Sequence, residues 1–469
     1  MKPSLLFLAA LSFTIHAESR VVGEAPNFVI ILGEAQGWAS MSEPQDDRNV
    51  TGSKSEFIRT LNLDSIAKAG VRFSDFYAGS PRCTPTRAAL VTGKSPAQLH
   101  MTFVNEGRKD GGVNPGDKVI APLCTTEMPV GIETMASIFK RAGYATAHFG
   151  KWHLGRANPR VHGFDENDGA NSNGGPENVE SPNPKQAYVI AKLGMDFITR
   201  QAQAKKPFLL QISQYPGRGP ETALPETVEA VKKRLGTRLD FQRIGLAAGD
   251  EEIDNSIGLL LAKLKELGLM TNTYIIYTAD HGAQGRNANG SLRNGKGTVW
   301  EGGLRVPLLI AGPGVKSGYC SHVRSSTVDV LPTVIELAGL KPDVLPDGIE
   351  GGSLVGILQQ GDRAPMKRSR DELVVHFPHY DKDDLGPATA ILMGNYKLIR
   401  FFEEDPRRKF FDLTNDLGEQ HDMAAARPDI VATMDQRLTE YLTLVKASLP
   451  TLNPNYHPNG ERSGDRRAK

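Results

Sequence analysis

The sequence predicts an α/β fold with a large, mostly parallel central sheet that carries helices on both faces, followed by a smaller C-terminal α+β subdomain. One observation is an alternation of short apolar, β-branched runs with amphipathic stretches of helical period, which starts near residue 26. Repeated succession of helix and strand is typical of parallel strands joined by crossover helices. The other observation is a polar, charged stretch at residues 359–371, which indicates a domain boundary.

The expected elements follow from these local patterns. Apolar β-branched runs predict strands at residues 28–32, 144–149, 208–213 and 273–278. Amphipathic runs predict helices at residues 61–69, 134–142, 187–202 and 251–267. Three of these helices are followed by the helix-ending glycines Gly70, Gly143 and Gly268. Beyond the boundary we expect strands at 373–377 and within 390–402, a helix at 428–449 and a loose tail after 450.

Length and composition limit both the fold and the partners. A chain of 469 residues has room for one large core or two domains, and we assign residues 21–360 to a main domain and 366–469 to a C-terminal subdomain. Lys and Arg number 55 against 54 Asp and Glu, and the resulting net charge of +1 argues against a nucleic-acid-binding surface. A hydrophobic content of 39% with 48 Gly and 30 Pro suits a loop-rich α/β enzyme.

Residues 1–17 have the pattern of a signal peptide. Lys2 supplies the positive end, residues 5–13 an apolar run and residues 15–17 a cleavage-site pattern. The apolar run is too short to cross a membrane and no later segment reaches the required length, so we expect no membrane span. The pattern predicts an exported protein, periplasmic or secreted, with a retained N-terminal helix as the alternative.

Segment 83–93, with the sequence CTPTRAALVTG, is the most informative part of the chain. Cys83 stands just ahead of an apolar helical run, where backbone N–H groups and the helix dipole favour an anion. Arg87 lies one turn further along the same face and is expected to help to hold that anion. These residues predict an activated cysteine or an anion site, with a buried structural thiol as the alternative. Cys124 and Cys320 could pair in an oxidising compartment or remain buried thiols.

Polar side chains follow directly after three of the expected strands. They are Glu34 after the first strand, Lys151 and His153 after the second, and Asp280 and His281 after the fourth. The carboxyl ends of parallel strands share one edge of the sheet, where open α/β sheets bind their ligands. We therefore expect these side chains to converge on one site, although each taken singly could be a surface or capping residue.

These segments resemble the type I, formylglycine-dependent sulfatases of the alkaline-phosphatase-like superfamily. Segment 83–93 resembles the family's signature, Cys-x-Pro-x-Arg followed by Thr-Gly. Residues 150–155 (GKWHLG) and 294–303 (NGKGTVWEGG) match two further family segments, and the resemblance covers nearly the whole chain. It implies an alkaline-phosphatase-like fold, with the sulfatase catalytic domain at residues 21–360.

The resemblance also implies roles for individual residues. Cys83 is converted by a maturation enzyme to formylglycine, whose hydrate is the nucleophile, and Arg87 and His153 are further catalytic residues. The implied ligands for Ca²⁺, or alternatively Mg²⁺, are Glu34, Cys83, Asp280 and His281. The implied binding residues for a sulfated carbohydrate or other sulfate ester are Lys151, Lys296, Arg218, His376 and His379.

The implied chemistry suits these residue types. Two lysines and a divalent cation neutralise the sulfate oxygens. One hydroxyl of the formylglycine hydrate attacks sulfur and the alcohol leaves on the opposite side. The sulfate then departs when the other hydroxyl loses its proton, for which His153 is the candidate base. An unmodified cysteine has no second hydroxyl and would stay sulfated.

The first departure from the family's pattern concerns the metal. The two adjacent aspartates that normally bind calcium are replaced by Glu34 and Ala35. Glu34 can still bind a hard cation, whereas Ala35 cannot, and the ion prefers six to eight oxygen ligands. Water, sulfate oxygens or the acidic pair Asp46 and Asp47 are the candidates to complete the set.

The second departure concerns the leaving group. Arg218 stands where the family has a histidine near the leaving-group oxygen. Arginine is a poor proton donor, so we expect it to bind sulfate or another anionic group, and His281, His376, His379 or water to donate the proton. We expect a sulfatase; the alternatives are a sulfatase-like glycan-binding protein with weak or no turnover and a phosphoesterase of the same superfamily.

Overall fold

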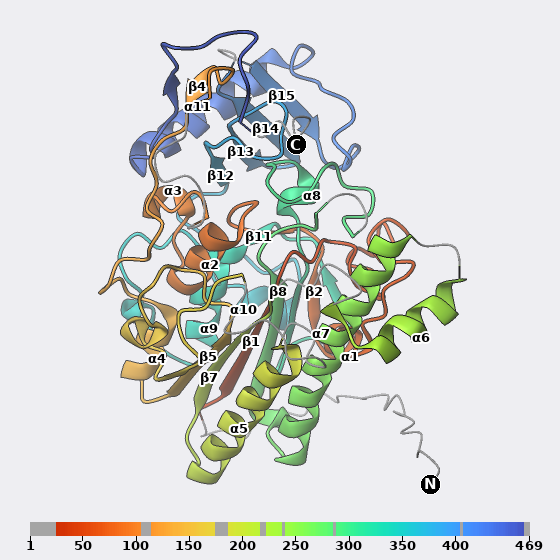
Figure 1. The fold of residues 1–469 in the computed structure, drawn as a ribbon. Coiled ribbons are helices and arrows are strands. Elements are labelled where there is room, and N and C mark those ends of the chain that lie inside the picture. The colour runs from red at the N-terminus through yellow and green to blue at the C-terminus, as the bar shows by residue number, and fades with distance from the viewer. Residues whose placement is uncertain are drawn as a thin grey trace.

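The protein consists of a main α/β domain and a smaller C-terminal α+β unit (Figure 1). The computed structural model describes residues 25–104, 114–173, 186–215, 222–236, 240–284, 288–403 and 407–463. The predicted fold class is confirmed. The expected signal peptide, residues 1–17, lies outside the described residues.

The main sheet has eight strands in the order β10-β2-β9-β8-β1-β7-β5-β6. All neighbours in this order are parallel except β9, which runs antiparallel to β2 and β8. The strands are β1 (Asn27–Gly33), β2 (Val71–Phe73), β5 (Ala145–Gly150), β6 (Glu166–Asn167), β7 (Phe208–Ser213), β8 (Thr273–Ala279), β9 (Leu308–Ala311) and β10 (Tyr319–Ser321). A separate parallel pair is formed by β3 (Phe76–Tyr77) and β11 (Ser325–Ser326).

Alternating side chains of the central strands build one core on each face of this sheet. Phe28, Ile30 and Leu32 of β1 pack with α2, α4, α9 and α10, and Val29 and Ile31 pack with α1, α5 and α7. The helices of the main domain are α1 (Leu61–Ala69), α2 (Cys83–Thr92), α3 (Pro96–Leu99), α4 (Met135–Arg141), α5 (Ala187–Ala204), α6 (Pro225–Leu235), α7 (Phe241–Glu266), α8 (Glu301–Leu304), α9 (Val330–Leu337) and α10 (Val355–Gln360). Helices therefore cover both faces, as predicted.

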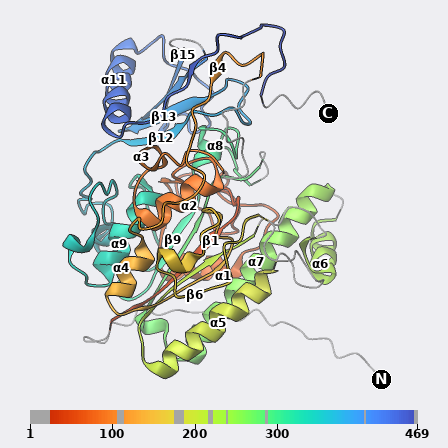
Figure 2. The ribbon, with the colours of Figure 1, turned by 60° about the vertical axis from the view of Figure 1, so that its left-hand side comes forward.

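The C-terminal unit is a four-stranded antiparallel sheet with one long helix. Its elements are β12 (Leu373–Phe377), β13 (Ala388–Met393), β14 (Tyr396–Phe401), β15 (Arg407–Asp412) and α11 (Pro428–Leu444). One face of the sheet packs on α11, and the other packs on Tyr77, Trp300 and Leu304 of the main domain. Figures 1 and 2 both place α2 and α8 between the two sheets.

Several element boundaries differ from the predictions. The expected strand region 390–402 is a hairpin, because β13 and β14 are separated by a turn at residues 394–395. The helix α7 begins ten residues earlier than expected, and α11 ends at Leu444. The tail is not loose throughout, since β16 (Thr451–Leu452) pairs with β4 (Val119–Ile120). No helix in the described part of the chain is both long and apolar enough to cross a membrane.

Candidate active site

Segments that carry the predicted site residues leave the same edge of the main sheet. Gly33 pairs with Ala279 at the ends of the neighbouring strands β1 and β8, so Glu34 emerges beside Asp280. β5 lies one strand beyond β7 on the other side of β1 and brings Lys151 to the same edge. The predicted convergence of the strand ends is confirmed.

Cys83 is the first residue of α2. Arg82 before it has an extended conformation and forms the N-cap, and the helix ends at Gly93, whose φ of 65° places it in the left-handed region. Cys83 therefore stands at the end of the helix where backbone N–H groups lack helical partners and the dipole is positive. The helix starts at Cys83 itself, and the expectation of an anion-favouring position holds.

The thiol of Cys83 is buried, with 2% exposure, among charged groups. Its Sγ lies 3.4 Å from Glu34 Oε1, 3.1 Å from His281 Nε2 and 3.7 Å from Lys296 Nζ. Burial and Glu34 raise the pKa of the thiol, but Lys151, His281 and Lys296 outweigh them and hold this pKa well below its usual value. The site therefore favours an anion at position 83.

Three cationic side chains surround the carboxylate of Glu34. Its Oε2 accepts hydrogen bonds from Lys151 Nζ at 2.7 Å and Arg87 Nη2 at 3.2 Å, and its Oε1 lies 3.3 Å from Lys296 Nζ. Burial alone would raise the pKa of Glu34, but Lys151 and Lys296 hold it well below its usual value. Glu34 is therefore ionised.

Asp280 and His281 place further acceptor atoms close to this carboxylate. His281 Nδ1 lies 2.9 Å from the carbonyl of Gly282, which can only accept, so the neutral ring keeps its proton on Nδ1 and its lone pair on Nε2. That Nε2 lies 3.4 Å from Asp280 Oδ1 and 3.8 Å from Glu34 Oε1. Burial raises the pKa of Asp280 to about 6, and Glu34 adds to this rise.

Acceptor atoms that face one another in a buried site need a proton or a metal cation between them. Glu34, Cys83, Asp280 and His281 each offer a ligand atom, and these atoms lie within 4.8 Å of one another. Two carboxylates with one imidazole fit a divalent cation, so the residues present agree with the predicted metal site.

Arg87 holds the carboxylates in place. Its Nε and Nη2 donate to Asp280 Oδ2 at 3.2 and 3.1 Å, and its Nη2 also reaches Glu34. A further bond runs from Nη1 to the carbonyl of Lys151. Arg87 thus ties three strand ends together, and its expected contact with an incoming anion stays a prediction.

The Cys83 cluster is defined here as Glu34, Cys83, Arg87, Lys151, Asp280, His281 and Lys296, each at most 5% exposed. Three cationic side chains in it accompany two carboxylates. A thiolate at position 83 would balance these charges, whereas an uncharged group there leaves one positive charge in excess, and a bound cation increases this excess. The cluster is therefore suited to an anionic ligand.

His153 is positioned through its backbone. Its carbonyl accepts a hydrogen bond from Thr84 Oγ1 at 2.9 Å, and its N–H donates to the carbonyl of Asn171 at 2.8 Å. The residue is buried and has a φ of 58°, a left-handed conformation that these bonds hold in place. Since Thr84 follows Cys83, His153 is anchored next to the candidate nucleophile; its role as a base stays a prediction.

His376 and His379 were expected to bind substrate. His376 in β12 is buried, and its ring bonds to Thr389 Oγ1 at 2.6 Å and to the carbonyl of Ser448 at 2.9 Å. Burial lowers the pKa of His376 to about 4. Since both ring nitrogens bond to the C-terminal unit, the structure does not bring His376 into the Cys83 cluster or support it as a proton donor.

His379 packs in a cluster of aromatic rings. Its Nε2 bonds to Thr102 Oγ1 at 2.8 Å, and its ring lies 4.9 Å from that of Phe103. The Arg82 guanidinium lies 5.7 Å from the centre of the Phe103 ring. This contact connects the aromatic cluster with the start of α2. Burial lowers the pKa of His379 to about 3, so it is neutral at pH 7. Its contact with substrate stays a prediction.

The acidic pair Asp46 and Asp47 does not complete the metal site. Asp46 pairs with Arg48 at 2.9 Å, and Asp47 pairs with His322 at 3.1 Å. Among the described residues, neither belongs to the group of ligand atoms around Glu34. This proposal for the missing ligands was wrong, because the loop turns these carboxylates toward the opposite edge strand β10.

The two departures from the family pattern have different outcomes. Ala35 has a φ of 55°, and its N–H donates to Asp280 Oδ1 at 3.1 Å. Position 35 therefore holds Asp280, a candidate metal ligand, through its backbone. Arg218 lies outside the described residues, and its anion-binding role stays a prediction.

Sequence reasoning missed two contacts at the rim of the cluster. Asn173 Oδ1 accepts a hydrogen bond from Lys151 Nζ at 2.7 Å, and Asp381 forms an ion pair with Arg82. Asn173 lies in a Gly- and Asn-rich loop without a periodic pattern, so no local feature distinguished it. Asp381 lies two residues after His379, an expected binding residue, and an acidic side chain at that distance was the available clue.

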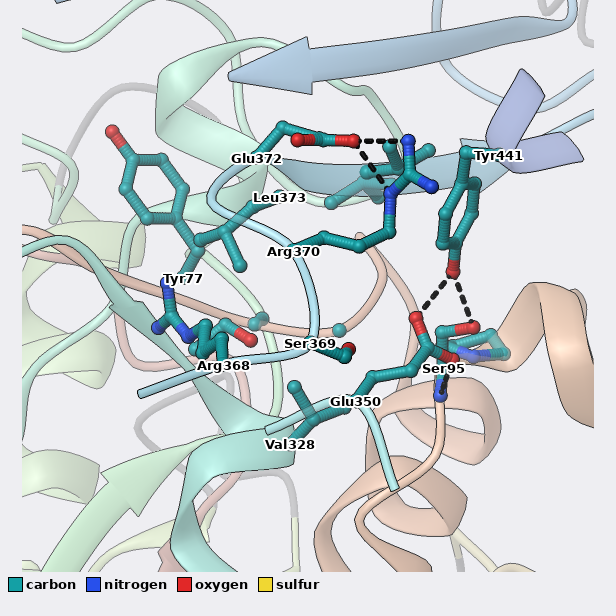
Figure 3. A pocket seen from close by; sticks show the side chains of 16 residues that line it. Tyr77, Ser95, Val328, Glu350, Arg368, Ser369, Arg370, Glu372, Leu373 and Tyr441 are labelled. Carbon is teal, nitrogen blue, oxygen red and sulfur yellow. Dashed lines mark hydrogen bonds and ion pairs between the residues drawn. The ribbon is translucent and has the colours of Figure 1, made fainter. Parts of the chain in front are cut away.

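The pocket in Figure 3 is a separate feature between the two units. Its water-accessible volume is about 40 Å³. Its polar walls pair with each other: Arg370 with Glu372, and Tyr441 with Ser95 and Glu350. These groups satisfy one another, and the pocket does not contain the predicted site residues.

Comparison with known proteins identifies the family. The family model described as Sulfatase matches residues 26–340, and the model described as N-sulphoglucosamine sulphohydrolase, C-terminal, matches residues 294–444. The chain belongs to the sulfatase family, as its signature segment predicted.

Two relatives show the extent of the similarity. The chain is 32% identical over 376 residues to human N-acetylgalactosamine-6-sulfatase, an alignment that covers 72% of this chain and 66% of the relative. It is 28% identical over 521 residues to human arylsulfatase A, which covers 95% of this chain and 93% of the relative. The chain spans about 65% of the length of the N-acetylgalactosamine-6-sulfatases that it matches.

A solved structure supports the fold. Ps i-CgsB, crystallised with k-i-k-neocarrahexaose, has a TM-score of 0.71 and 22% sequence identity to this chain. The match covers 89% of this chain and 93% of the solved one. The fold shared with this structure therefore extends across both units described above.

Proposed function

We propose that this protein is an exported sulfatase that hydrolyses sulfate esters on a sulfated carbohydrate, with a formylglycine nucleophile made from Cys83. The observation that carries the proposal is the position of Cys83 at the N-terminus of α2, facing Glu34, His281 and Lys296. Family membership supports a sulfatase reaction, and the excess positive charge of the Cys83 cluster supports an anionic substrate.

Each side chain of the cluster has a part in this proposal. Lys151 and Lys296 neutralise the sulfate oxygens, which develop further charge as the ester bond breaks. Arg87 holds Glu34 and Asp280 in position. His153 accepts the proton whose loss releases sulfate from the formylglycine hydrate.

A divalent cation, Ca²⁺ or alternatively Mg²⁺, would be held by Glu34, Asp280, His281 and residue 83. When bound, it would supply Lewis-acid polarisation of a sulfate oxygen. Formylglycine supplies a hydrated aldehyde with two hydroxyl groups, and a formylglycine-maturation enzyme is the partner that the conversion of Cys83 requires.

The choice of a carbohydrate rests on relatives rather than on a pocket of this chain. A human relative is named N-acetylgalactosamine-6-sulfatase, and a structural neighbour was crystallised with k-i-k-neocarrahexaose. Export rests on the pattern of residues 1–17. N-terminal sequencing of protein recovered outside the cytoplasm tests export; a mature start near residue 18 is the expected result, and an intact residue 1 in a purely cytoplasmic pool contradicts it.

The test of function is a substrate panel with a matched variant. Protein co-expressed with a maturation enzyme is assayed on sulfated oligosaccharides, aryl sulfates and the corresponding phosphate esters, beside Cys83→Ala. We expect sulfate release that is lost in Cys83→Ala and is highest on a sulfated oligosaccharide. Binding of sulfated glycans without turnover would instead indicate a glycan-binding protein, and faster hydrolysis of phosphate esters would indicate a phosphoesterase.

A further inference from the structure

A second group of metal-ligating side chains lies at the edge strand β10, outside the Cys83 cluster. Cys320 is in β10, His322 follows that strand, and Asp47 comes from the loop between β1 and α1. Cys320 and His322 are two residues apart in extended chain, which places both on one side of the backbone. The structure keeps Cys320 and Cys124 as free thiols, so the pairing considered for them does not occur.

The three side chains are close enough to share one ion. A ligand atom from each of Asp47, Cys320 and His322 lies within 4.8 Å of the other two. Asp47 Oδ1 is 3.1 Å from His322 Nε2, and Cys320 Sγ donates to the carbonyl of Gln45 at 3.5 Å. Cys320 is 6% exposed, whereas the side chain of Asp47 is 54% exposed. The group is closed on the thiol side and open to water on the carboxylate side.

The hydrogen bonds behind His322 determine which nitrogen faces the group. His322 Nδ1 lies 2.9 Å from Ser74 Oγ, and Ser74 Oγ donates to Asp75 Oδ1 at 2.8 Å. Because the hydroxyl proton is directed to Asp75, Ser74 Oγ accepts from Nδ1–H. A neutral His322 therefore presents the lone pair of Nε2 toward Asp47. A carboxylate-to-histidine relay of this kind is how proteins orient histidine ligands.

Two acceptor atoms at 3.1 Å require a positive centre between them. A proton would meet this need and would make His322 an imidazolium paired with Asp47. A metal ion would meet it as well, and it would also use the thiol of Cys320. The neighbouring carboxylates are already neutralised, since Asp75 pairs with Arg305 at 2.9 Å and Asp46 with Arg48 at 2.9 Å.

We propose that Asp47, Cys320 and His322 form a second metal site, which takes a zinc-like divalent ion with water as the fourth ligand. Cysteine sulfur, imidazole nitrogen and a carboxylate oxygen are ligands that Zn²⁺ accepts in tetrahedral sites. Bonds of about 2.0–2.3 Å place such ligands roughly 3.3–3.8 Å apart. The Asp47–His322 distance is close to this range, and Cys320 Sγ lies within 4.8 Å of both other ligand atoms, so it has to approach them by at most about 1 Å to bind the same ion.

The two groups of ligands select different ions. The Cys83 cluster is rich in carboxylate and suits a hard cation, whereas a thiolate with an imidazole selects a softer one. An ion at Asp47, Cys320 and His322 would connect the β1–α1 loop to the edge strand β10. Its role is therefore structural, at a place where the main sheet would otherwise expose an edge.

Cobalt is the probe that tests this site, because Co²⁺ bound by a thiolate gives a near-ultraviolet charge-transfer band. The titration uses Cys83→Ser protein, which removes the thiol of the other cluster, and the loss of the proton from Cys320 makes the band stronger at higher pH. Because Glu34, Asp280 and His281 can still bind Co²⁺ in this variant, we expect the band to be complete after at most two equivalents. Cys124→Ser added to this background should keep it, and Cys320→Ser or His322→Ala should remove it.

Asp47→Asn keeps the experiment decisive if Cys320→Ser fails to fold, because Asp47 is exposed. Competition with a chromogenic chelator measures the affinity for Zn²⁺. We expect Asp47→Asn to bind Zn²⁺ at least about tenfold more weakly, because even the loss of a residue that only hydrogen-bonds to a metal ligand typically costs that much. A thiolate band that survives Cys320→Ser overturns the proposal. So does the absence of any band in Cys83→Ser protein, which would leave an imidazolium paired with Asp47.

Discussion

The Cys83 cluster and a second buried cluster around Glu301 both hide several charges, but they pair these charges differently. The Glu301 cluster consists of Glu301, Arg305, Lys397 and Glu419, all buried. Lys397 Nζ lies 2.9 Å from Glu301 Oε1 and 2.8 Å from Glu419 Oε1. Arg305 Nε donates to Glu301 Oε2 at 2.8 Å. Every cation in it therefore lies between acceptors.

The Glu301 cluster joins the two units of the protein. Glu301 begins α8, and Lys397 lies in β14 of the C-terminal sheet. Glu419 Oε2 accepts the N–H of Glu301 at 2.7 Å, which caps the short helix. Because Lys296 lies just before α8, this joint also fixes the loop that reaches Cys83.

This contrast separates buried charge that stabilises a fold from buried charge that serves a reaction. In the Glu301 cluster donors and acceptors alternate, and its two cations equal its two carboxylates in number. In the Cys83 cluster the acceptors Glu34, Asp280 and His281 face one another, and the cations outnumber the carboxylates. Such an incomplete network is typical of sites that bind ions and substrate.

The largest expected effect is on the nucleophile. Cys83→Ala should lower the turnover of sulfate esters by more than about 10³-fold, since removal of a catalytic nucleophile abolishes the covalent route. Sulfate release is the measurement, and Cys124→Ala, which removes a thiol outside both clusters, is the control. Equal turnover in Cys83→Ala and wild type would place the reaction elsewhere.

The next effect is on stability. Lys397→Met should lower the free energy of unfolding by about 3–5 kcal/mol, because it leaves Glu301 and Glu419 buried without their shared cation. Urea unfolding monitored by circular dichroism measures it. A loss below 1 kcal/mol, the size typical of an exposed pair, would show that the joint contributes little.

Unlike Lys397→Met, Lys296→Met should lower turnover strongly and the free energy of unfolding only slightly. We expect turnover to fall by about 10²–10³-fold, the loss typical of removing one donor to the developing charge. The unfolding free energy should change by about 1 kcal/mol or less, because Lys151 and Arg87 still pair with Glu34. Initial rates and urea unfolding on the same preparations compare the two effects. If Lys296→Met were destabilising but fully active, the distinction between the clusters would be wrong.

Ala35→Asp should strengthen the metal site. The φ of 55° at position 35 is a conformation that Asp tolerates better than Ala, and the new carboxylate would add an oxygen ligand near Glu34 and Asp280. We expect Ca²⁺ to bind about tenfold more tightly by calorimetry, with Ala35→Asn as the neutral control. Unchanged affinity would mean that the side chain at position 35 does not reach the ion.

The smallest effect is the pH dependence of the Glu301 cluster. Burial raises the pKa of Glu419 to about 7, and Glu301 adds to the rise although Lys397 opposes it. When the pKa of a carboxyl group is higher in the folded than in the unfolded protein, the free energy of unfolding falls as the pH rises from the unfolded to the folded pKa. The free energy of unfolding of Glu419→Gln, measured in urea and taken relative to wild type, should therefore be higher at pH 8 than at pH 5. The same difference at both pH values would contradict this assignment.

Local patterns predicted the fold well where an element carries its own apolar period. The helix at 61–69 and the strand at 208–213 have the expected bounds, because buried apolar faces and terminal breakers set them. The first turns of α7 were missed because its stripe there is made of small residues such as Ala247 and Ala248. β15 was missed because three of its six residues are Arg or Lys, as befits an edge strand.

The site was predictable in its position but not in its pairings. Strand ends share an edge by topology, so Glu34 and Asp280 could be placed together from the sequence. Which groups pair depends on side-chain reach, and for this reason Arg87 on the carboxylates and His376 inside the C-terminal unit were not foreseen. Asp46 and Asp47 are close to Glu34 in sequence, yet the loop carries them to β10.

The proposed mechanism requires that Cys83 is converted to formylglycine and that the Cys83 cluster uses this group as its nucleophile. Mass spectrometry of the peptide that contains residue 83, from protein co-expressed with a maturation enzyme, tests it most directly. We predict a peptide in which the CH₂–SH group of Cys83 has been replaced by an aldehyde, together with its hydrate. A peptide that contains only unmodified cysteine, from a preparation that still hydrolyses sulfate esters, would contradict the account.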